Sequence, residues 1–309
     1  MIRSRLGVVV MAYGTPAMVG DIEAYYTHIR RGRPPTADQL TDLTNRYAAI
    51  GGLSPMAERT EAQRRAIAAA LDALGDRSFD VVLGQKHAGP FIEDAVAELA
   101  DKGVDRVVGL VLAPHYSAAS VGQYHQRAAD ASAECGIEYR RVDQWYDLDA
   151  FVEHQAASLR ATLDTMPPRT KTVFTAHSLP ERALVDDPYA DQLFASAHAI
   201  AEAAGLGRWA GWGVAWQSAG RTPEPWRGPD ILEVIDDLAA TGRAEAIVVV
   251  PQGFTSDHLE VLYDIDIEAD RRAASHGLRL ARAQVVNADP TVMKALAQRV
   301  LATLDEAVG

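Results

Sequence analysis

The chain has 309 residues, enough for about two domains, and its 48% hydrophobic and 23% charged residues are typical of a globular protein. The net charge of -12 argues against nucleic acids and anionic membranes as partners and suits a protein that attracts metal cations. A single cysteine, Cys135, excludes an internal disulfide, a zinc ribbon and an iron–sulfur cluster held by the chain's own thiolates.

The first half alternates apolar strands with amphipathic helices. We expect strands at residues 6–12, 79–83, 106–112 and 138–142, and helices at 22–31, 38–47, 58–74, 90–102 and 121–135. The second half repeats the alternation. We expect strands at 171–175, 209–216, 246–250 and 281–286, and helices at 148–163, 189–204 and 231–240, with another after Asp257 and a last one starting at Asp289-Pro290.

This alternation predicts an α/β fold with parallel sheets covered by helices on both faces. The two halves also echo each other, because AYGTP (12–16) follows the first strand and AHSLP (176–180) follows the first strand of the second half. We therefore expect two similar halves, residues 1–145 and 146–285, and a closing helix within 286–309 that packs back on the N-terminal half. No apolar run approaches the ~18 residues of a membrane span. The N-terminal VVVMAYGTPA predicts a strand and turn rather than a signal peptide, so we expect a cytoplasmic protein.

An acidic segment follows the strand at 246–250. On an α-helix, which turns by about 100° per residue, Asp257, Glu260, Asp264 and Glu268 would share one stripe. Such carboxylates repel each other unless a cation lies over them. The alternative is a hydrated acidic face in which Asp257 and Glu260 form a capping box.

Polar side chains stand at the predicted carboxyl ends of the strands, where open parallel sheets bind ligands. They are Tyr13, His87, His115 and His177. The sequence contains no GxGxxG or Walker motif, which argues against nucleotide binding. A phenol, imidazoles and carboxylates instead bind a first-row divalent metal and move protons. Each histidine could alternatively be a buried core or capping residue, and we interpret His258, one position off the acidic stripe, as structural.

The first half also carries arginines suited to an anion. Arg30, Arg31 and Arg33 follow a helix, and Arg46 and Ser54 flank a glycine turn. Guanidinium groups bind carboxylates in a bidentate manner, although for Arg33 we favour an ordinary surface role. Tyr124 could add a hydrogen bond. A carboxylate-bearing ligand that meets a divalent metal fits these features.

Eight segments together resemble the ferrochelatase family, in order and over essentially the whole chain. They are MAYGTP, YYTHIRRGR, RYAAIGGLSP, KHAGPFIEDAV, LAPHYSAASVGQY, AHSLPE, WQSAGRTPEPWRGPD and GFTSDHLEVLYDID. The resemblance is to the soluble monoderm branch, which inserts ferrous iron into coproporphyrin III to give iron-coproporphyrin III in haem biosynthesis. It implies two Rossmann-like, chelatase-type halves with the porphyrin cleft between them.

The resemblance also implies roles for particular residues. His177 and Glu260 resemble the pair that binds ferrous iron and removes porphyrin protons, and Tyr13 resembles the axial ligand to product iron. Asp264 and Glu268 resemble an outer site for Mg²⁺ or another divalent cation. The contacts to the macrocycle and its propionates correspond to Arg30, Arg46, Tyr47, Ser54 and Tyr124. Some relatives carry an iron–sulfur cluster, which Cys135 alone cannot hold.

Two alternatives stay open at this point. One is a chelatase for another tetrapyrrole or metal, such as a protoporphyrin IX ferrochelatase or a cobaltochelatase, since these ligands also suit zinc, cobalt and copper. The other is a non-catalytic haem or metal carrier. We further expect Fe²⁺ to be a substrate, no tightly bound cofactor, and no stable membrane anchor, because the apolar lip of membrane-associated relatives is missing. We expect a monomer in transient contact with neighbouring enzymes of the haem pathway.

Overall fold

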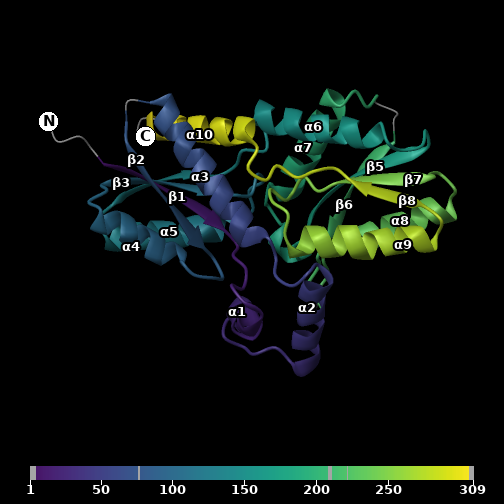
Figure 1. Ribbon diagram of the computed structural model, residues 1–309, viewed down its shortest axis with the longest axis horizontal. Coiled ribbons are helices and arrows are strands. Elements are labelled where there is room, and N and C mark those ends of the chain that lie inside the picture. Colours follow the sequence, from purple (N-terminus) through teal and green to yellow (C-terminus); the bar gives the residue numbers. More distant parts are fainter. Residues whose placement is uncertain (1–4, 76, 208–210, 221, 306–309) are drawn as a thin grey trace. The chain divides into compact units, whose positions relative to one another are not determined.

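The computed structural model describes residues 5–75, 77–207, 211–220 and 222–305 (Figure 1). The chain divides into two compact units. The first contains the residues up to Ala113, Ala119–Trp145, and the residues from Asn287 onward; the second contains Pro114–Ala118 and Tyr146–Val286.

The first unit is built on a four-stranded parallel sheet. Its strands are β1 (Leu6–Ala12), β2 (Phe79–Gln85), β3 (Arg106–Val111) and β4 (Glu138–Val142), in the order β2-β1-β3-β4. Strand β1 is buried along its whole length because it pairs on both sides, with Val10 opposite Leu83 on β2 and Leu110 on β3.

Helices cover both faces of this sheet (Figure 1). α3 (Met56–Leu74) packs against α10 (Pro290–Asp305), and α4 (Ile92–Asp101) packs against α5 (Val121–Glu134). Strand β1 is followed by the short turn η1 (Val19–Asp21), α1 (Ile22–Ile29) and α2 (Ala37–Ala49). The closing helix begins as predicted, because Asp289 Oδ1 accepts the backbone N–H groups of Thr291 and Val292, each at 3.0 Å. The last residues of the predicted 286–309 segment, 306–309, lie outside the described chain.

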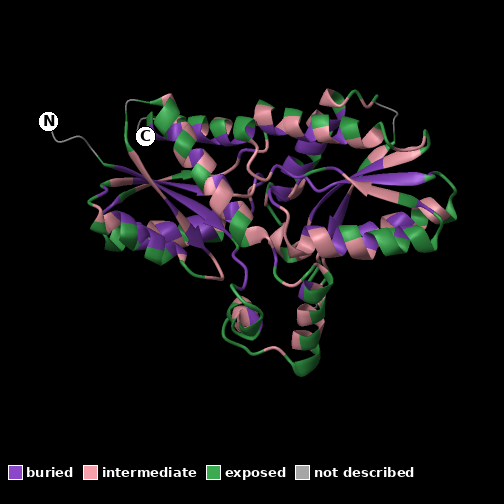
Figure 2. Ribbon diagram, viewed as in Figure 1, coloured by how far each residue is buried: buried purple, intermediate pink, exposed green. Residues whose placement is uncertain are grey.

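The second unit repeats the plan. Its parallel strands β5 (Thr170–His177), β6 (Trp212–Gln217), β7 (Ala246–Val250) and β8 (Arg279–Arg282) run in the order β6-β5-β7-β8. Both sheets therefore have the same order: second, first, third and fourth strand. This sheet is flanked by α6 (Asp149–Leu163), the turn η2 (Glu181–Ala183), α7 (Tyr189–Ala203) and α8 (Ile231–Ala240). The buried strands lie between helices that are exposed only on their outer faces (Figure 2).

The segment after β7 differs from the prediction. It runs as a turn to Leu259, then forms the π-helix η3 (Glu260–Ala269), and only afterwards α9 (Asp270–Ser275). A π-helix closes i→i+5 hydrogen bonds, so the stripe calculated for an α-helix is wrong. Asp257 lies before the helix, where its Oδ1 pairs with Arg282 Nη1 at 3.1 Å.

Several strand boundaries also differ: β2 ends two residues later than predicted, β3 ends one residue earlier, and β5 extends beyond its predicted limits at both ends. β8 is shorter and begins earlier than the predicted 281–286. The predicted strand at 209–216 is described from Trp212, and residues 209 and 210 lie outside the described chain. Among the described residues, no helix has both the length and the hydrophobicity to cross a membrane.

Candidate active site

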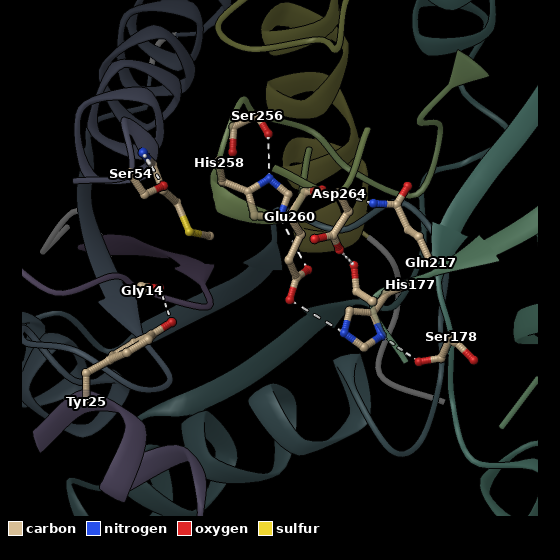
Figure 3. Close-up of polar contacts among 12 residues, drawn as sticks. Gly14, Tyr25, Ser54, His177, Ser178, Gln217, Ser256, His258, Glu260 and Asp264 are labelled. Carbon is tan, nitrogen blue, oxygen red and sulfur yellow. Dashed lines mark hydrogen bonds and ion pairs between the residues drawn. The ribbon is translucent and has the colours of Figure 1, made fainter. Parts of the chain in front are cut away.

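His177 is the last residue of β5, at the carboxyl end of a central strand of the second unit. Its Nδ1 lies 2.5 Å from the carbonyl oxygen of Ser178, which can only accept, so Nδ1 carries a proton. The other ring nitrogen, Nε2, lies 3.6 Å from Glu260 Oε1 (Figure 3). The backbone thus fixes the ring orientation and leaves Nε2 facing Glu260.

Glu260 opens η3 and projects its carboxylate between two imidazoles. Oε1 faces His177, and Oε2 lies 3.5 Å from Nε2 of His258, whose Nδ1 donates to the Ser256 carbonyl at 2.9 Å (Figure 3). The Glu260 backbone carbonyl accepts a hydrogen bond of 3.0 Å from Gln217 Nε2, at the end of β6. The end of one strand and the first turn of the π-helix therefore set the carboxylate opposite His177.

The pair is strongly polarised. Burial alone would lower the pKa of His177, but the charge and hydrogen bond of Glu260 outweigh it and raise this pKa to about 9. Burial would likewise raise the pKa of Glu260, yet His177 and His258 hold that carboxyl well below its usual range. At neutral pH the pair is an imidazolium and a carboxylate, so a metal cation must displace the proton on Nε2.

Asp264 continues the acidic segment along η3. It is 6% exposed and accepts a hydrogen bond from Ser218 Oγ, and its charge also contributes to raising the pKa of His177. Glu268 is half-buried farther along the same helix. Of the four carboxylates predicted to share a stripe, η3 carries Glu260, Asp264 and Glu268. Within the described parts of the chain, no cluster of three or more histidine, cysteine or acidic side chains forms a complete metal cage.

Tyr13 lies in the first unit, directly after β1, with 37% of its surface exposed. Its ring packs against His87 at a centroid distance of 4.6 Å, and His87 Nδ1 lies 2.9 Å from His28 Nδ1. Burial, with the nearby charges of Lys86 and His28, lowers the pKa of His87 to about 3, so this ring is neutral at physiological pH. Tyr13 therefore presents its phenol from a firmly packed aromatic cluster.

The predicted anion-binding residues also lie in the first unit. Arg30 and Arg33 each donate Nε to the other's carbonyl, at 3.2 and 3.3 Å, so Arg33 braces the segment that carries Arg30. Arg46 pairs with Asp42 at 3.2 Å. The remaining three predicted residues, Tyr47, Ser54 and Tyr124, are buried. The Tyr47 hydroxyl lies 3.5 Å from Thr15 Oγ1, and Ser54 Oγ accepts a hydrogen bond from the Met56 N–H.

His115 has a structural environment. It is buried in the second unit, where its Nε2 lies 2.7 Å from Ser196 Oγ. Sequence reasoning missed three polar residues at these sites. His258 was assigned a structural role because it lay off the α-helical stripe, although its place two residues before Glu260 was a usable signal. Gln217 ends β6 and Ser218 directly follows it, so their position at the strand end could have indicated them.

Lys86 is a fourth residue that the sequence did not single out. Its Nζ lies 4.9 Å from the centre of the Tyr124 ring, and burial, reinforced by the charges of Arg127 and Arg31, lowers its pKa to about 8. It directly precedes His87 at the end of β2, so strand-end position was again the available signal.

Comparison with known proteins identifies the family of the chain. The family model described as Ferrochelatase matches residues 5–304. A coproporphyrin III ferrochelatase of Geobacillus kaustophilus is 44% identical over 308 residues, covering 97% of this chain and 96% of that protein. One of Bacillus subtilis is 44% identical over 311 residues, covering 98% of this chain and 99% of that protein.

Solved structures support the fold. The chelatase SirB from Bacillus subtilis, solved with Fe³⁺, aligns with a TM-score of 0.58 at 13% identity over 97% of this chain and 96% of that one. CbiX, a terminal enzyme of sirohaem biosynthesis in denitrifying bacteria, aligns with a TM-score of 0.54 at 15% identity over 97% of this chain and 100% of that one. The predicted fold class of two chelatase-type halves is thus confirmed. With a family model and full-length relatives matching, the chain belongs to the ferrochelatase family.

Proposed function

We propose that this protein inserts ferrous iron into coproporphyrin III and releases iron-coproporphyrin III, as a step of haem biosynthesis. The observation that carries the proposal is the His177–Glu260 pair at the carboxyl end of β5, with Nε2 and Oε1 3.6 Å apart. Relatives named coproporphyrin III ferrochelatase, 44% identical over nearly the whole chain, support the substrate assignment.

The pair has the chemistry that metalation requires. Fe²⁺ enters the macrocycle as two pyrrole N–H protons leave, so the charge of the macrocycle is unchanged. The ferrous ion replaces the proton on His177 Nε2, while the Ser178 carbonyl keeps Nδ1–H in place. Once the iron has moved to the pyrrole nitrogens, the vacated imidazole accepts one of the two released protons, the Glu260 carboxylate stabilises the resulting imidazolium, and the second proton passes to solvent. The raised pKa of His177, about 9, makes the ring an effective proton acceptor at neutral pH.

The remaining acidic residues on η3 suit an outer cation site. Asp264 and Glu268 would bind Mg²⁺ or another divalent cation and would transfer metal ions or protons to Glu260. The hydrogen bond from Ser218 to Asp264 supports this role, because it orients a carboxylate that burial would otherwise disfavour in its charged form.

The first unit supplies groups suited to the porphyrin. Arg30, Arg46, Tyr47, Ser54 and Tyr124 would contact the macrocycle and its propionates, and Tyr13 would bind the product iron axially. Coproporphyrin III carries four propionates, and arginine is the side chain best matched to carboxylates.

We further propose that the protein acts as a cytoplasmic monomer, in transient contact with neighbouring haem-pathway enzymes. It would need no tightly bound cofactor and no iron–sulfur cluster. The single cysteine of the sequence, Cys135, supports the last point, because a cluster needs several thiolates.

A metalation assay tests the function. Purified protein at substoichiometric amounts is mixed anaerobically with Fe²⁺ and either coproporphyrin III or protoporphyrin IX, and product is followed by absorbance. We expect many equivalents of product per protein and a clear preference for coproporphyrin III. A yield that stops at one equivalent would identify a carrier, and equal efficiency with both porphyrins would reject the substrate assignment.

A further inference from the structure

Tyr189 lies directly behind the metal pair. It is the first residue of α7 and is buried, and its hydroxyl donates a 3.2 Å hydrogen bond to the backbone carbonyl of His177. Its own backbone N–H is accepted by Asp187 Oδ1 at 3.0 Å, which fixes the start of the helix. The phenol thus reaches from the helix to the last residue of β5.

The His177–Ser178 peptide is consequently held on both sides. Its N–H, that of Ser178, donates to the Gln217 carbonyl on β6 at 2.8 Å, and its carbonyl accepts from Tyr189. The next carbonyl, that of Ser178, receives His177 Nδ1–H. Rotation of the clamped peptide would move this acceptor, and the imidazole would turn with it. The orientation of Nε2 toward Glu260 therefore depends on the clamp.

The phenol ring is itself rigidly packed. It lies 5.9 Å from the Trp216 ring and 6.4 Å from the His115 ring, the latter edge-on at 85°. Burial, together with the charges of Glu260 and Asp187, raises the pKa of Tyr189. The hydroxyl is the donor in its hydrogen bond to the His177 carbonyl, because a carbonyl oxygen can only accept.

His115 is fixed in turn by a buried chain of hydrogen bonds. Ser196 Oγ donates to Gln252 Oε1 at 2.8 Å, so it must accept from His115 Nε2, 2.7 Å away. Burial lowers the pKa of His115 to about 3, which keeps this ring neutral. The hydrogen bonds thus define the tautomer of His115, and Tyr189 packs against a buried, hydrogen-bonded ring.

We propose that Tyr189 is a positioning residue of the reaction: its hydroxyl clamps the His177–Ser178 peptide and thereby holds His177 Nε2 opposite Glu260. This inference rests on the proposed function. Removing the hydroxyl deletes one neutral hydrogen bond. Residues that hydrogen-bond behind a metal-binding histidine orient it, so their loss weakens metal binding. The expected effect is an approximately fivefold loss of metal affinity.

Tyr189→Phe tests the proposal, because it removes the hydroxyl and keeps the ring that packs on Trp216 and His115. Tyr146→Phe is the matched control: its ring also stacks on His115, at 5.6 Å, and no hydrogen bond of its hydroxyl occurs within the described residues. Affinity for Co²⁺ is measured by calorimetry without porphyrin, and kcat and KM are then measured for Fe²⁺ and for coproporphyrin III.

We expect Tyr189→Phe to bind Co²⁺ about fivefold more weakly and to raise the KM for Fe²⁺, with the KM for porphyrin unchanged. Tyr146→Phe should match the wild type in each respect. The variant should fold, because one neutral hydrogen bond is a small part of total stability. Wild-type Co²⁺ affinity and wild-type KM for Fe²⁺ in Tyr189→Phe would overturn the positioning role.

A further variant, His177→Ala, distinguishes a wrong positioning role for Tyr189 from a wrong assignment of the metal-binding pair. If His177→Ala loses Co²⁺ binding while Tyr189→Phe is unchanged, only the positioning role is wrong. If His177→Ala binds Co²⁺ as well as the wild type, the metal pair itself is wrong, and the role of Tyr189 falls with it.

Discussion

His177 Nε2 and Glu260 Oε1 lie 3.6 Å apart; the His177 ring donates Nδ1–H to the Ser178 carbonyl, and the Glu260 backbone carbonyl accepts a hydrogen bond from Gln217. His177 belongs to the end of a strand and Glu260 to the first turn of a π-helix. The two groups therefore come from rigid elements of one unit. Such preorganisation is what a site needs when it must bind a metal ion and then release it.

His177→Ala should abolish iron insertion while the fold survives, because the side chain stands at a strand end and is about one-third exposed. Glu260→Gln, nearly the same size, should lose most activity by removing the negative charge. Anaerobic metalation rates and circular dichroism are the measurements. Near-normal turnover in a folded His177→Ala protein would contradict the assigned role.

The pair also predicts how stability depends on pH. His177 has a pKa of about 9 against an ordinary 6.5, so its contribution is complete below about pH 6.5 and is lost as pH rises through 9. Glu260 has a lowered pKa against an ordinary 4.5, so its contribution is present above about pH 4.5 and is lost on acidification. Urea unfolding should show that His177→Ala costs more free energy of unfolding at pH 6 than at pH 9.5. An equal cost at both pH values would contradict the coupling.

Metal binding should release a proton, because the imidazolium must give up Nε2–H. Calorimetric titration of Co²⁺ at pH 7.5 in buffers of different ionisation enthalpy should report about one proton released per metal bound. The same titration of Glu260→Gln should report fewer, since the pKa of His177 falls when the carboxylate charge is removed. No buffer dependence in the wild type would show that His177 is already neutral.

The double variant Asp264→Asn, Glu268→Gln tests the outer cation site. We expect it to weaken the Mg²⁺ or Co²⁺ dependence of turnover more than it weakens porphyrin binding. Without metal, stability should be unchanged or slightly raised, because like-charge repulsion along η3 is relieved and the amide oxygen introduced by Asp264→Asn can still accept from Ser218. Asp270→Asn, an exposed acid at the start of α9, is the control. An unchanged metal titration would leave these residues as a hydrated acidic surface.

Arg46→Ala should weaken coproporphyrin binding by about tenfold to a hundredfold, because an Arg–carboxylate contact shielded from water contributes roughly 1.5–3 kcal/mol. Protoporphyrin IX has vinyl groups in place of two propionates. Its binding should be weakened less by Arg46→Ala if Arg46 faces a position that carries a vinyl group in protoporphyrin IX. Arg65→Ala, an arginine on α3 that is 73% exposed in an ion pair with Glu61, is the matched control. Fluorescence quenching gives both affinities. Equal losses for the two porphyrins would argue against recognition of the extra propionates.

The sequence by itself determined the α/β alternation, most element boundaries and the position of His177 at a strand end. These depend on hydrophobic periodicity and on breakers such as Pro180 and Gly253, which act over a few residues. The match of β1, β4, β7 and α8 to their predicted limits reflects this local control. The roles of the site residues came from motif resemblance and stay predictions until the variants above are measured.

The tertiary structure alone decided how the acidic segment is presented. Periodicity cannot distinguish i→i+4 from i→i+5 hydrogen bonding in so short a segment, so the π-helix was missed. Arg282, distant in sequence, pairs with Asp257, which belonged to the predicted stripe, and also with Asp266, which did not. His258 became a partner of Glu260 because the turn before η3 bends its ring back toward the carboxylate. The Arg282 ion pairs depend on residues distant along the chain, for which local sequence carries no signal, whereas the π-helix and the His258 contact are local geometries that hydrophobic periodicity does not resolve.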